Sequence, residues 1–119
     1  MEIETRLSDQ VARYMDLAVS EVKLTAANMA NIDTPGYQAL GMNFEAEMRE
    51  ALGAVDNGGR ARPVRVKTVE GLIARPDGND VSMDRESLNL AEAQLKFKTG
   101  VALLRQEYQR VMDAIHADK

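Results

Sequence analysis

The chain has 119 residues, no cysteine and a formal net charge of −4 at pH 7. This length suits one domain, and the lack of cysteine excludes disulfide bonds and thiolate metal ligands. Net negative charge argues against nucleic acid or an acidic membrane as the main partner. No apolar run reaches the roughly 20 residues of a membrane-spanning helix, and the first ten residues lack the apolar core of a cleavable signal peptide.

Apolar residues at steps of three and four predict a long amphipathic helix from about residue 5 to residue 30. Thr5 or Ser8 is a candidate for its N-cap. The apolar face comprises Leu7, Val11, Tyr14, Ala18, Val22, Thr25 and Met29, and Leu17 and Leu24 widen it.

The segment from Asn28 to Tyr37 combines several residues that end a helix. Pro35 lacks a backbone N–H and forces Thr34 out of the helical region. Pro35 and Gly36 suit the two central positions of a type II turn, in which the glycine needs a positive φ. Tyr37 offers a large side chain that can anchor the reversed chain.

The middle of the chain predicts one short helix. Asn43 can cap it, and the breaker segment 56–59 ends it. Its apolar side carries Phe44, Met48, Leu52 and Val55, and its glutamates Glu45, Glu47 and Glu50 are interpreted as a solvated face.

Residues 60–80 show the weakest pattern. Val64 and Val66 alternate with charged residues, and Leu72–Ile73 follows a glycine, which permits two short strands or merely extended chain. Residues 76–80 predict another turn.

A second long helix is predicted from about residue 84 to residue 116. Its apolar seam alternates steps of four and three, as in a coiled coil, and Gln94 interrupts it. Gly100 lies inside this helix, where close approach by a neighbour or a tolerated surface position explains it. The seam comprises Leu90, Phe97, Val101, Leu104, Tyr108, Val111 and Ile115, and a second stripe comprises Leu88, Ala91, Leu95 and Ala102.

These elements predict an all-α fold in which the long N- and C-terminal helices pair as an antiparallel coiled coil. A short helix and an irregular or short-strand segment lie between them. We expect one domain over residues 1–119, with the N-terminal helix in 1–31, the turn motif, short helix and extended middle in 32–83, and the C-terminal helix in 84–119.

A single partner helix leaves part of each apolar face uncovered. We expect Leu88, Leu95 or Leu17 to stay exposed, which is typical of an assembly surface. The alternative explanation of the seams is the core of a monomeric helical hairpin.

The residues predict no catalytic, cofactor or metal site. His116 is the only histidine, and it suits the C-terminal end of a helix dipole. The acidic turn at 77–80 has residues of a calcium loop, but Leu88 stands where that loop needs glutamate. The glycine-rich segment 57–60 lacks the spacing of a phosphate loop. We therefore expect no enzyme, no cofactor and no small-molecule substrate.

One basic run, Arg60, Arg62, Arg65 and Lys67, crosses the irregular middle. Nucleic acid is disfavoured because no aromatic residue is interleaved and the net charge is negative. Contact with acidic faces of neighbouring subunits and a plain solvated loop both remain open.

The motif Asn-x-x-Asn-x-x-Thr-Pro-Gly-Tyr resembles the signature of the bacterial flagellar rod, hook and hook–filament junction proteins. Asn28, Asn31, Thr34, Pro35, Gly36 and Tyr37 match it. The segments 79–86 and 90–97 are similar to the C-terminal half of a proximal-rod protein. Gln38 and Leu40–Gly41 depart from the family's pattern.

The resemblance implies a structural subunit of the flagellar proximal rod. Such subunits leave the cell through the flagellar type III system without a cleaved signal and stack helically into the drive shaft across the periplasm. The implied partners are copies of the same chain, other proximal-rod proteins, the inner-membrane ring and the export gate. The implied assembly seam joins Leu7, Val11, Tyr14 and Val22 to the seam of the C-terminal helix.

Two rival hypotheses remain. The chain resembles other proximal-rod proteins through the same turn motif, so membership in one of those is the first alternative. A non-flagellar coiled-coil adaptor is the second, and it leaves the segment from Asn28 to Tyr37 unexplained.

Overall fold

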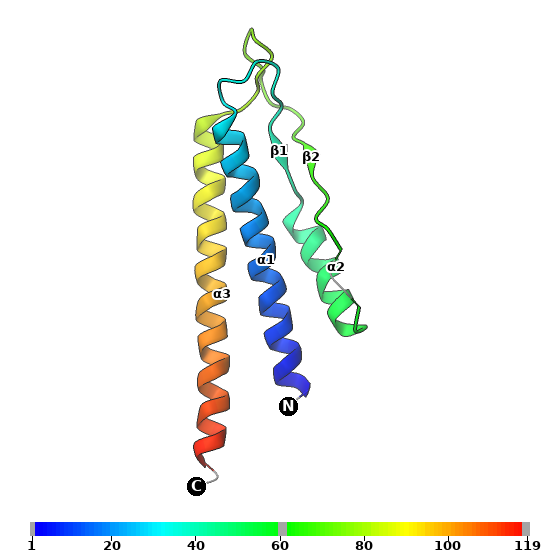
Figure 1. Ribbon diagram of the computed structural model, residues 1–119, viewed down its shortest axis with the longest axis vertical. Helices are drawn as coiled ribbons and strands as arrows, with labels where there is room; N and C mark the ends of the chain where they lie inside the picture. The colour runs from blue at the N-terminus through cyan, green and yellow to red at the C-terminus, as the bar shows by residue number, and fades with distance from the viewer. Residues whose placement is uncertain (1, 60–61, 118–119) are drawn as a thin grey trace.

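The computed structural model describes residues 2–59 and 62–117, with side chains from Arg6 onward. The described chain forms the helices α1 (Glu2–Ala30), α2 (Phe44–Asp56) and α3 (Met83–Ala117) and the short strands β1 (Leu40–Gly41) and β2 (Lys67–Thr68). Figure 1 shows α1 and α3 side by side and antiparallel, with α2 and both strands beyond α1. The predicted all-α fold with paired terminal helices is confirmed.

The N-terminal helix begins earlier than predicted. Because α1 starts at Glu2, Thr5 and Ser8 lie inside the helix, and the prediction that either caps it is wrong. No glycine or proline occurs before Pro35, so no residue of α1 breaks the helix between its start and the turn motif.

Residues of α3 that are buried recur every seventh position. They are Glu86, Ala93, Gly100 and Glu107. Small residues allow close helix approach here, since a Cβ at Gly100 would lie 2.4 Å from Met15 Cγ. Close approach is therefore the correct explanation of Gly100.

The predicted seam of the C-terminal helix lies on a different face of α3 from the buried residues named above. Val101, Leu104 and Val111 are half-buried, whereas Gln94, Tyr108 and Ile115 are exposed. The largest apolar side chains flank the contact with α1 because small residues occupy its centre.

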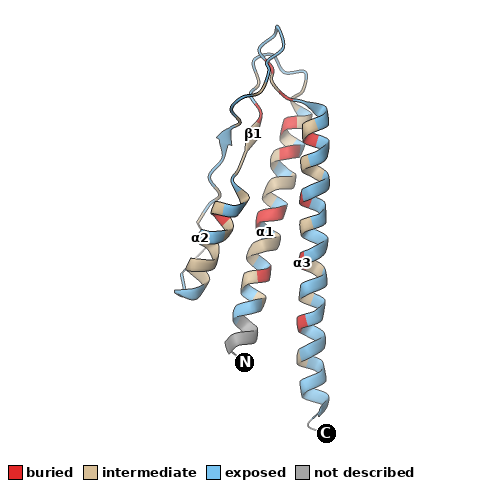
Figure 2. Cartoon of the chain, turned by 180° about the vertical axis from the view of Figure 1, so that it is seen from behind, coloured by how far each residue is buried: buried red, intermediate tan, exposed pale blue. Residues whose placement is uncertain are grey.

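Buried residues occur along most of α1 (Figure 2), and this helix packs against both α3 and α2. Of the three leucines expected to stay exposed, Leu17 is covered: it is only 7% exposed and lies beside α2 and residues 62–64. Leu88 and Leu95 remain 60% and 66% exposed, as expected.

The short helix α2 follows its local signals. Asn43 caps it, because its side-chain Oδ1 accepts a hydrogen bond of 3.0 Å from the Ala46 N–H. The Phe44 ring packs edge-on against the Tyr14 ring, with centroids 5.5 Å apart, and Lys96 Nζ lies 3.9 Å from the Phe44 centroid. The start of α2 is thereby tied to both long helices.

The strands differ from those predicted. β1 pairs antiparallel with β2, with Leu40 opposite Thr68 and Gly41 opposite Lys67. Neither 64–66 nor 72–73 forms a strand, which leaves extended chain, the second alternative, at both positions. The partner of β2 is Leu40–Gly41, directly after the turn motif, and the alternation of apolar residues does not specify that partner.

Across residues 2–59 and 62–117, none of the helices combines the length and the apolar character needed to cross a membrane.

Candidate functional site

Polar side chains hold together the end of the α1–α3 helix pair at which α1 stops and α3 starts. We call this pair of helices the hairpin. Two segments meet there, residues 28–40, which contain the turn motif, and residues 75–86, which lead into α3. We call these two segments together the clasp. In Figure 1 the loops of the clasp, 31–39 and 75–82, lie beyond the ends of α1 and α3, and its remaining residues belong to the helix ends and to β1.

The turn inside the motif has the predicted geometry. The Thr34 carbonyl accepts a hydrogen bond of 3.2 Å from the Tyr37 N–H, and Gly36 has a φ of +74°. A positive φ at the third residue is what a type II turn requires. Thr34 also bonds back to Asn31, with Oγ1 donating to Oδ1 at 3.0 Å.

Asn28 is the central side chain of the clasp and is only 1% exposed. Its Nδ2 donates to the Leu40 carbonyl at 2.8 Å and to Glu86 Oε1 at 3.1 Å. Its Oδ1 accepts from the Leu40 N–H at 2.9 Å and from the Tyr37 hydroxyl at 3.3 Å. Two donors and two acceptors are the full capacity of an amide side chain. Asn28 therefore joins α1, the chain after the turn and α3.

Asn79, which is fully buried, performs the same task from the other segment. Its Nδ2 donates to the carbonyls of Asn31 and Thr34, both at 2.8 Å, and its Oδ1 accepts from the Val81 N–H at 2.9 Å. A helix leaves its last carbonyls without partners, and Asn79 supplies a donor just beyond the end of α1.

The acidic turn serves the backbone. Asp80 Oδ1 accepts from the Ala39 N–H at 2.6 Å, and Asp77 Oδ1 accepts from the Asn79 N–H at 3.0 Å. Nowhere in the described part of the chain do three or more Asp, Glu or His side chains gather into a group that could hold a metal ion.

Sequence reasoning missed three residues of the clasp. Asn79 and Glu86 lie in the segment that carries the family resemblance, but no local sequence pattern indicated that they hold the turn. Arg75 lies outside that segment, and no pattern indicated its role either. It donates from Nη1 to the Val81 carbonyl at 3.1 Å and from Nη2 to the Ile32 carbonyl.

We expect Gly36→Val to lower the free energy of unfolding by about 1–2 kcal/mol, because a positive φ is costly for a β-branched residue. A steric clash does not cause this loss of stability, since no atom lies within 4 Å of a Cβ built at Gly36. Urea denaturation followed by circular dichroism measures the effect.

Gly53→Ala is the matched control for this prediction. Gly53 also has nothing within 4 Å of a Cβ, but it lies in α2, where alanine is favoured over glycine by about 1 kcal/mol. A Gly36→Val protein as stable as the wild type would contradict the argument from φ.

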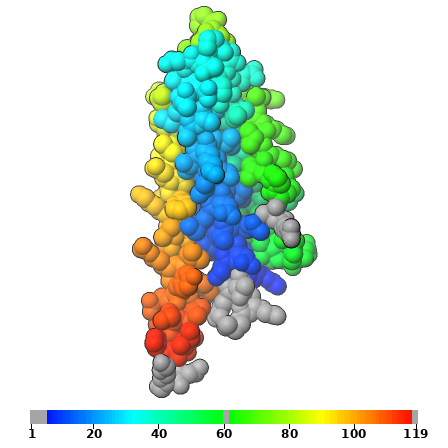
Figure 3. Space-filling view, viewed as in Figure 1, coloured from blue at the N-terminus to red at the C-terminus, as the bar shows by residue number. Residues whose placement is uncertain are grey.

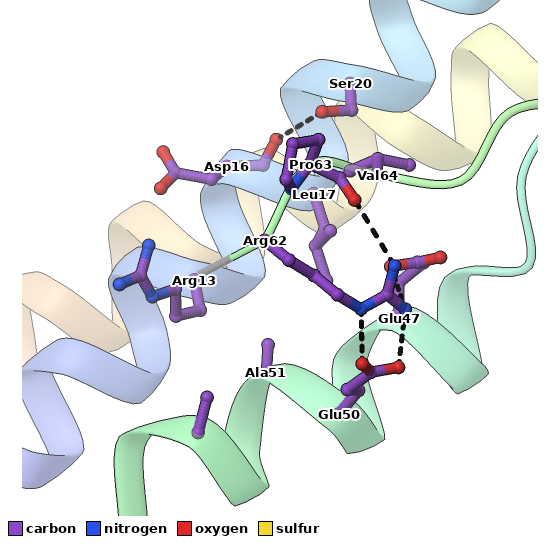
Figure 4. A pocket seen from close by; sticks show the side chains of 11 residues that line it. Arg13, Asp16, Leu17, Ser20, Glu47, Glu50, Ala51, Arg62, Pro63 and Val64 are labelled. Atoms are coloured by element: carbon purple, nitrogen blue, oxygen red, sulfur yellow. Dashed lines mark hydrogen bonds and ion pairs between the residues drawn. The ribbon is translucent and has the colours of Figure 1, made fainter. Parts of the chain in front are cut away.

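A second polar cluster fastens the middle of the chain to α2. Arg65 Nε lies 3.0 Å from Glu47 Oε1, Arg62 Nη2 lies 3.3 Å from Glu47 Oε2, and both arginines also pair with Glu50. Figure 4 shows Arg62 reaching the two glutamates beside a pocket of about 360 Å³, into which Leu17 projects from α1. We call these four charged residues the ion cluster.

The ion cluster corrects one interpretation of the sequence and adds a contact that the sequence did not predict. Glu47 is only 5% exposed, so it does not belong to a solvated face. Arg62 and Arg65 form ion pairs with glutamates of their own chain. Arg60, which belongs to the same basic run, lies outside the described residues.

The ion cluster shifts the pKa of its groups. Burial acts to raise the pKa of the Glu47 carboxyl, but hydrogen bonds from Arg65 and the charges of Arg62 and Arg65 outweigh it, so this pKa is lowered. The hydrogen bond from Arg62 lowers the pKa of Glu50, and the same bond raises the pKa of Arg62.

We expect the ion cluster to stabilise the protein at neutral pH and to lose this effect in acid. A carboxyl whose pKa is lowered by folding stabilises fully above its unfolded pKa, here 4.5, and loses that contribution as pH falls through its lower folded value. The urea midpoint of wild type should therefore exceed that of Glu47→Gln at pH 7, with the gap narrowing below pH 4.5. A gap that is the same at pH 7 and pH 3 would contradict this.

The seam residues of α1 have different surroundings. Val11 is buried, Tyr14 and Val22 are half-buried, and Leu7 is 38% exposed. On α3, Leu90 is half-buried and Phe97 is 38% exposed. The hairpin thus covers the two seams in part.

Known proteins resemble this chain over most of its length. The flagellar basal body rod protein FlgB of Cereibacter sphaeroides is 32% identical over 90% of this chain and 91% of its own. FlgB of Salmonella typhimurium is 31% identical over 85% and 86%, and FlgB of Escherichia coli is 23% identical over 87% and 88%. No family model matches the chain. At this identity and coverage, the chain belongs to the FlgB family of flagellar basal body rod proteins.

Proposed function

We propose that this protein is a structural subunit of the proximal rod of the bacterial flagellar basal body, with no catalytic role. The clasp is the observation that carries this proposal. All six residues of the family's turn motif lie in it, and it fixes the direction in which the chain leaves α1. A subunit of a rotating shaft needs such a rigid joint, because each copy must present its surfaces in one orientation.

Export and assembly are further parts of the proposal. The protein leaves the cell through the flagellar type III system without a cleaved signal peptide, and it assembles with copies of itself and other proximal-rod proteins. The inner-membrane ring and the export gate are its neighbours at the base. The absence of cysteine suits passage as an unfolded chain, since no disulfide can form on the way.

The seam of α3 belongs to this assembly proposal. Tyr108 and Ile115 are 69% and 52% exposed, and Met112 beside them is 47% exposed. Apolar side chains gathered at one end of a helix commonly mark a contact with another protein. We propose that neighbouring subunits cover this end.

Deletion of the gene in its own bacterium tests the function. Cells should lose swimming motility, purified basal bodies should lack the rod, and a plasmid carrying the wild-type gene should restore both. Mass spectrometry should find the protein in wild-type basal bodies. A deletion strain that swims with intact rods would instead favour the non-flagellar adaptor.

A further inference from the structure

The outer face of α3 carries an apolar stripe that the hairpin leaves uncovered. Leu88 and Leu95 are 60% and 66% exposed, and Ala102, seven residues further on, is also exposed. Each stands two positions after a buried residue that faces α1, which places it about 200° around the helix. The stripe therefore points away from α1.

A matching stripe follows the outer face of α1. Ala12, Val19 and Ala26 are exposed and are also seven residues apart, and Val19 is 37% exposed. In Figure 3 part of α1 is uncovered between α3 and α2 along the front of the molecule. The axes of two packed helices lie about 8–10 Å apart. At that distance, small side chains on one helix leave room for leucines on the other.

The two stripes lie at the same heights along the hairpin. Asn28 contacts Glu86, and Gly100 lies against Met15 and Tyr14, which fixes the antiparallel register of α1 and α3. In this register Leu88 is level with Ala26, Leu95 with Val19, and Ala102 with Ala12. Two copies placed side by side at one height thus bring each leucine opposite a smaller side chain.

Charge complementarity supports the same pairing. Lys23 follows Val19 by four residues, and Glu92 follows Leu88 by four residues, so each lies on the same flank of its stripe. In an antiparallel helix pair, equivalent flanks face each other. Both side chains are exposed, and neither forms an ion pair within the described residues.

We propose that the outer stripe of α3 packs against the outer stripe of α1 of a second copy, antiparallel and at the same height. This inference rests on the proposed function, since it names the surface through which copies join. The contact uses different faces on the two copies, so it repeats around an axis and generates a ring or a helical turn. Lys23 and Glu92 set its register at the rim.

Disulfide cross-linking tests this contact, because the chain has no cysteine of its own. Cells make two single-cysteine variants together, and their purified basal bodies are oxidised. A disulfide needs Cα atoms within about 7 Å, so Leu88→Cys with Ala26→Cys should give at least about fivefold more mixed dimer than Leu88→Cys with Ala12→Cys. Ala12 is a matched control, since it is an exposed alanine on the same face, about 21 Å away along the helix.

A second control tests whether the exposure of a cysteine alone explains its cross-linking. Leu95→Cys should cross-link to Val19→Cys and not to Ile73→Cys, although Ile73 is 93% exposed. Lys23→Glu in the Ala26→Cys chain should lower the yield of the first pair about threefold, and adding Glu92→Lys to the Leu88→Cys chain should restore it. Lys98→Glu in the Leu88→Cys chain should leave the yield unchanged. Equal yields for the predicted and control pairs would overturn the contact.

The same pairs are oxidised in concentrated purified protein, which separates this contact from the proposed function. Basal bodies that contain the protein but lack the predicted cross-links overturn the contact and leave the function standing. Cross-links in the purified protein, with none of it in basal bodies, support the contact and overturn the function.

Discussion

Asn28→Asp should lower the free energy of unfolding by about 3–5 kcal/mol, although the two side chains have the same shape. Both hydrogen bonds from Nδ2 are lost, so the Leu40 carbonyl lacks its side-chain donor. The new carboxylate also stands where Nδ2 lies 3.1 Å from Glu86 Oε1. Glu86 is 1% exposed, so water screens the repulsion little, although Arg85, whose Nη1 lies 2.9 Å from Glu86 Oε1, opposes it.

Urea denaturation of Asn28→Asp, Glu86→Gln and the double variant measures this coupling. The amide introduced at position 86 can donate to the carboxylate introduced at position 28, so the double variant should recover about 1–2 kcal/mol relative to Asn28→Asp. Gln94→Glu makes the same amide-to-acid change at an exposed site of α3 and should stay within about 0.5 kcal/mol of wild type. An Asn28→Asp protein as stable as this control would show that the clasp does not hold the hairpin.

Gly100→Leu should lower the free energy of unfolding by about 3 kcal/mol or more, because overpacking forces the two long helices apart. A Cβ at this position already lies 2.4 Å from Met15 Cγ and 3.2 Å from its Sδ. Gln106→Leu adds a leucine at an exposed position of the same helix and should change stability by less than about 0.5 kcal/mol.

Removing the Met15 side chain tests the cause. Without it, the nearest remaining atom to the new Cβ is Tyr14 Cδ1 at 3.5 Å, an ordinary contact. Gly100→Ala should therefore be better tolerated in a Met15→Ala background, where the helix gains about 1 kcal/mol from alanine. If Gly100→Ala has the same effect in both backgrounds, Met15 is not the obstacle.

The elements that sequence predicted well are those whose signals are local. Asn43 and the breaker residues 56–59 bound α2 within one turn of the helix that they cap. The turn at Thr34–Tyr37 follows from Pro35 and Gly36, because each restricts its own backbone. A resemblance carried by six motif positions and by the segments 79–86 and 90–97 then predicted the family, which the comparisons confirmed.

The sequence by itself determined the two long helices, the capped short helix, the turn and the family. Only the tertiary structure decided which face of α3 meets α1, because apolar periodicity marks large side chains whereas Ala93 and Gly100 form the closest contact. It also decided that Glu47 is buried and that Asn28 bonds Glu86, 58 residues away. A buried polar group is stable only with its partner, and nothing near it in the chain specifies a partner so distant.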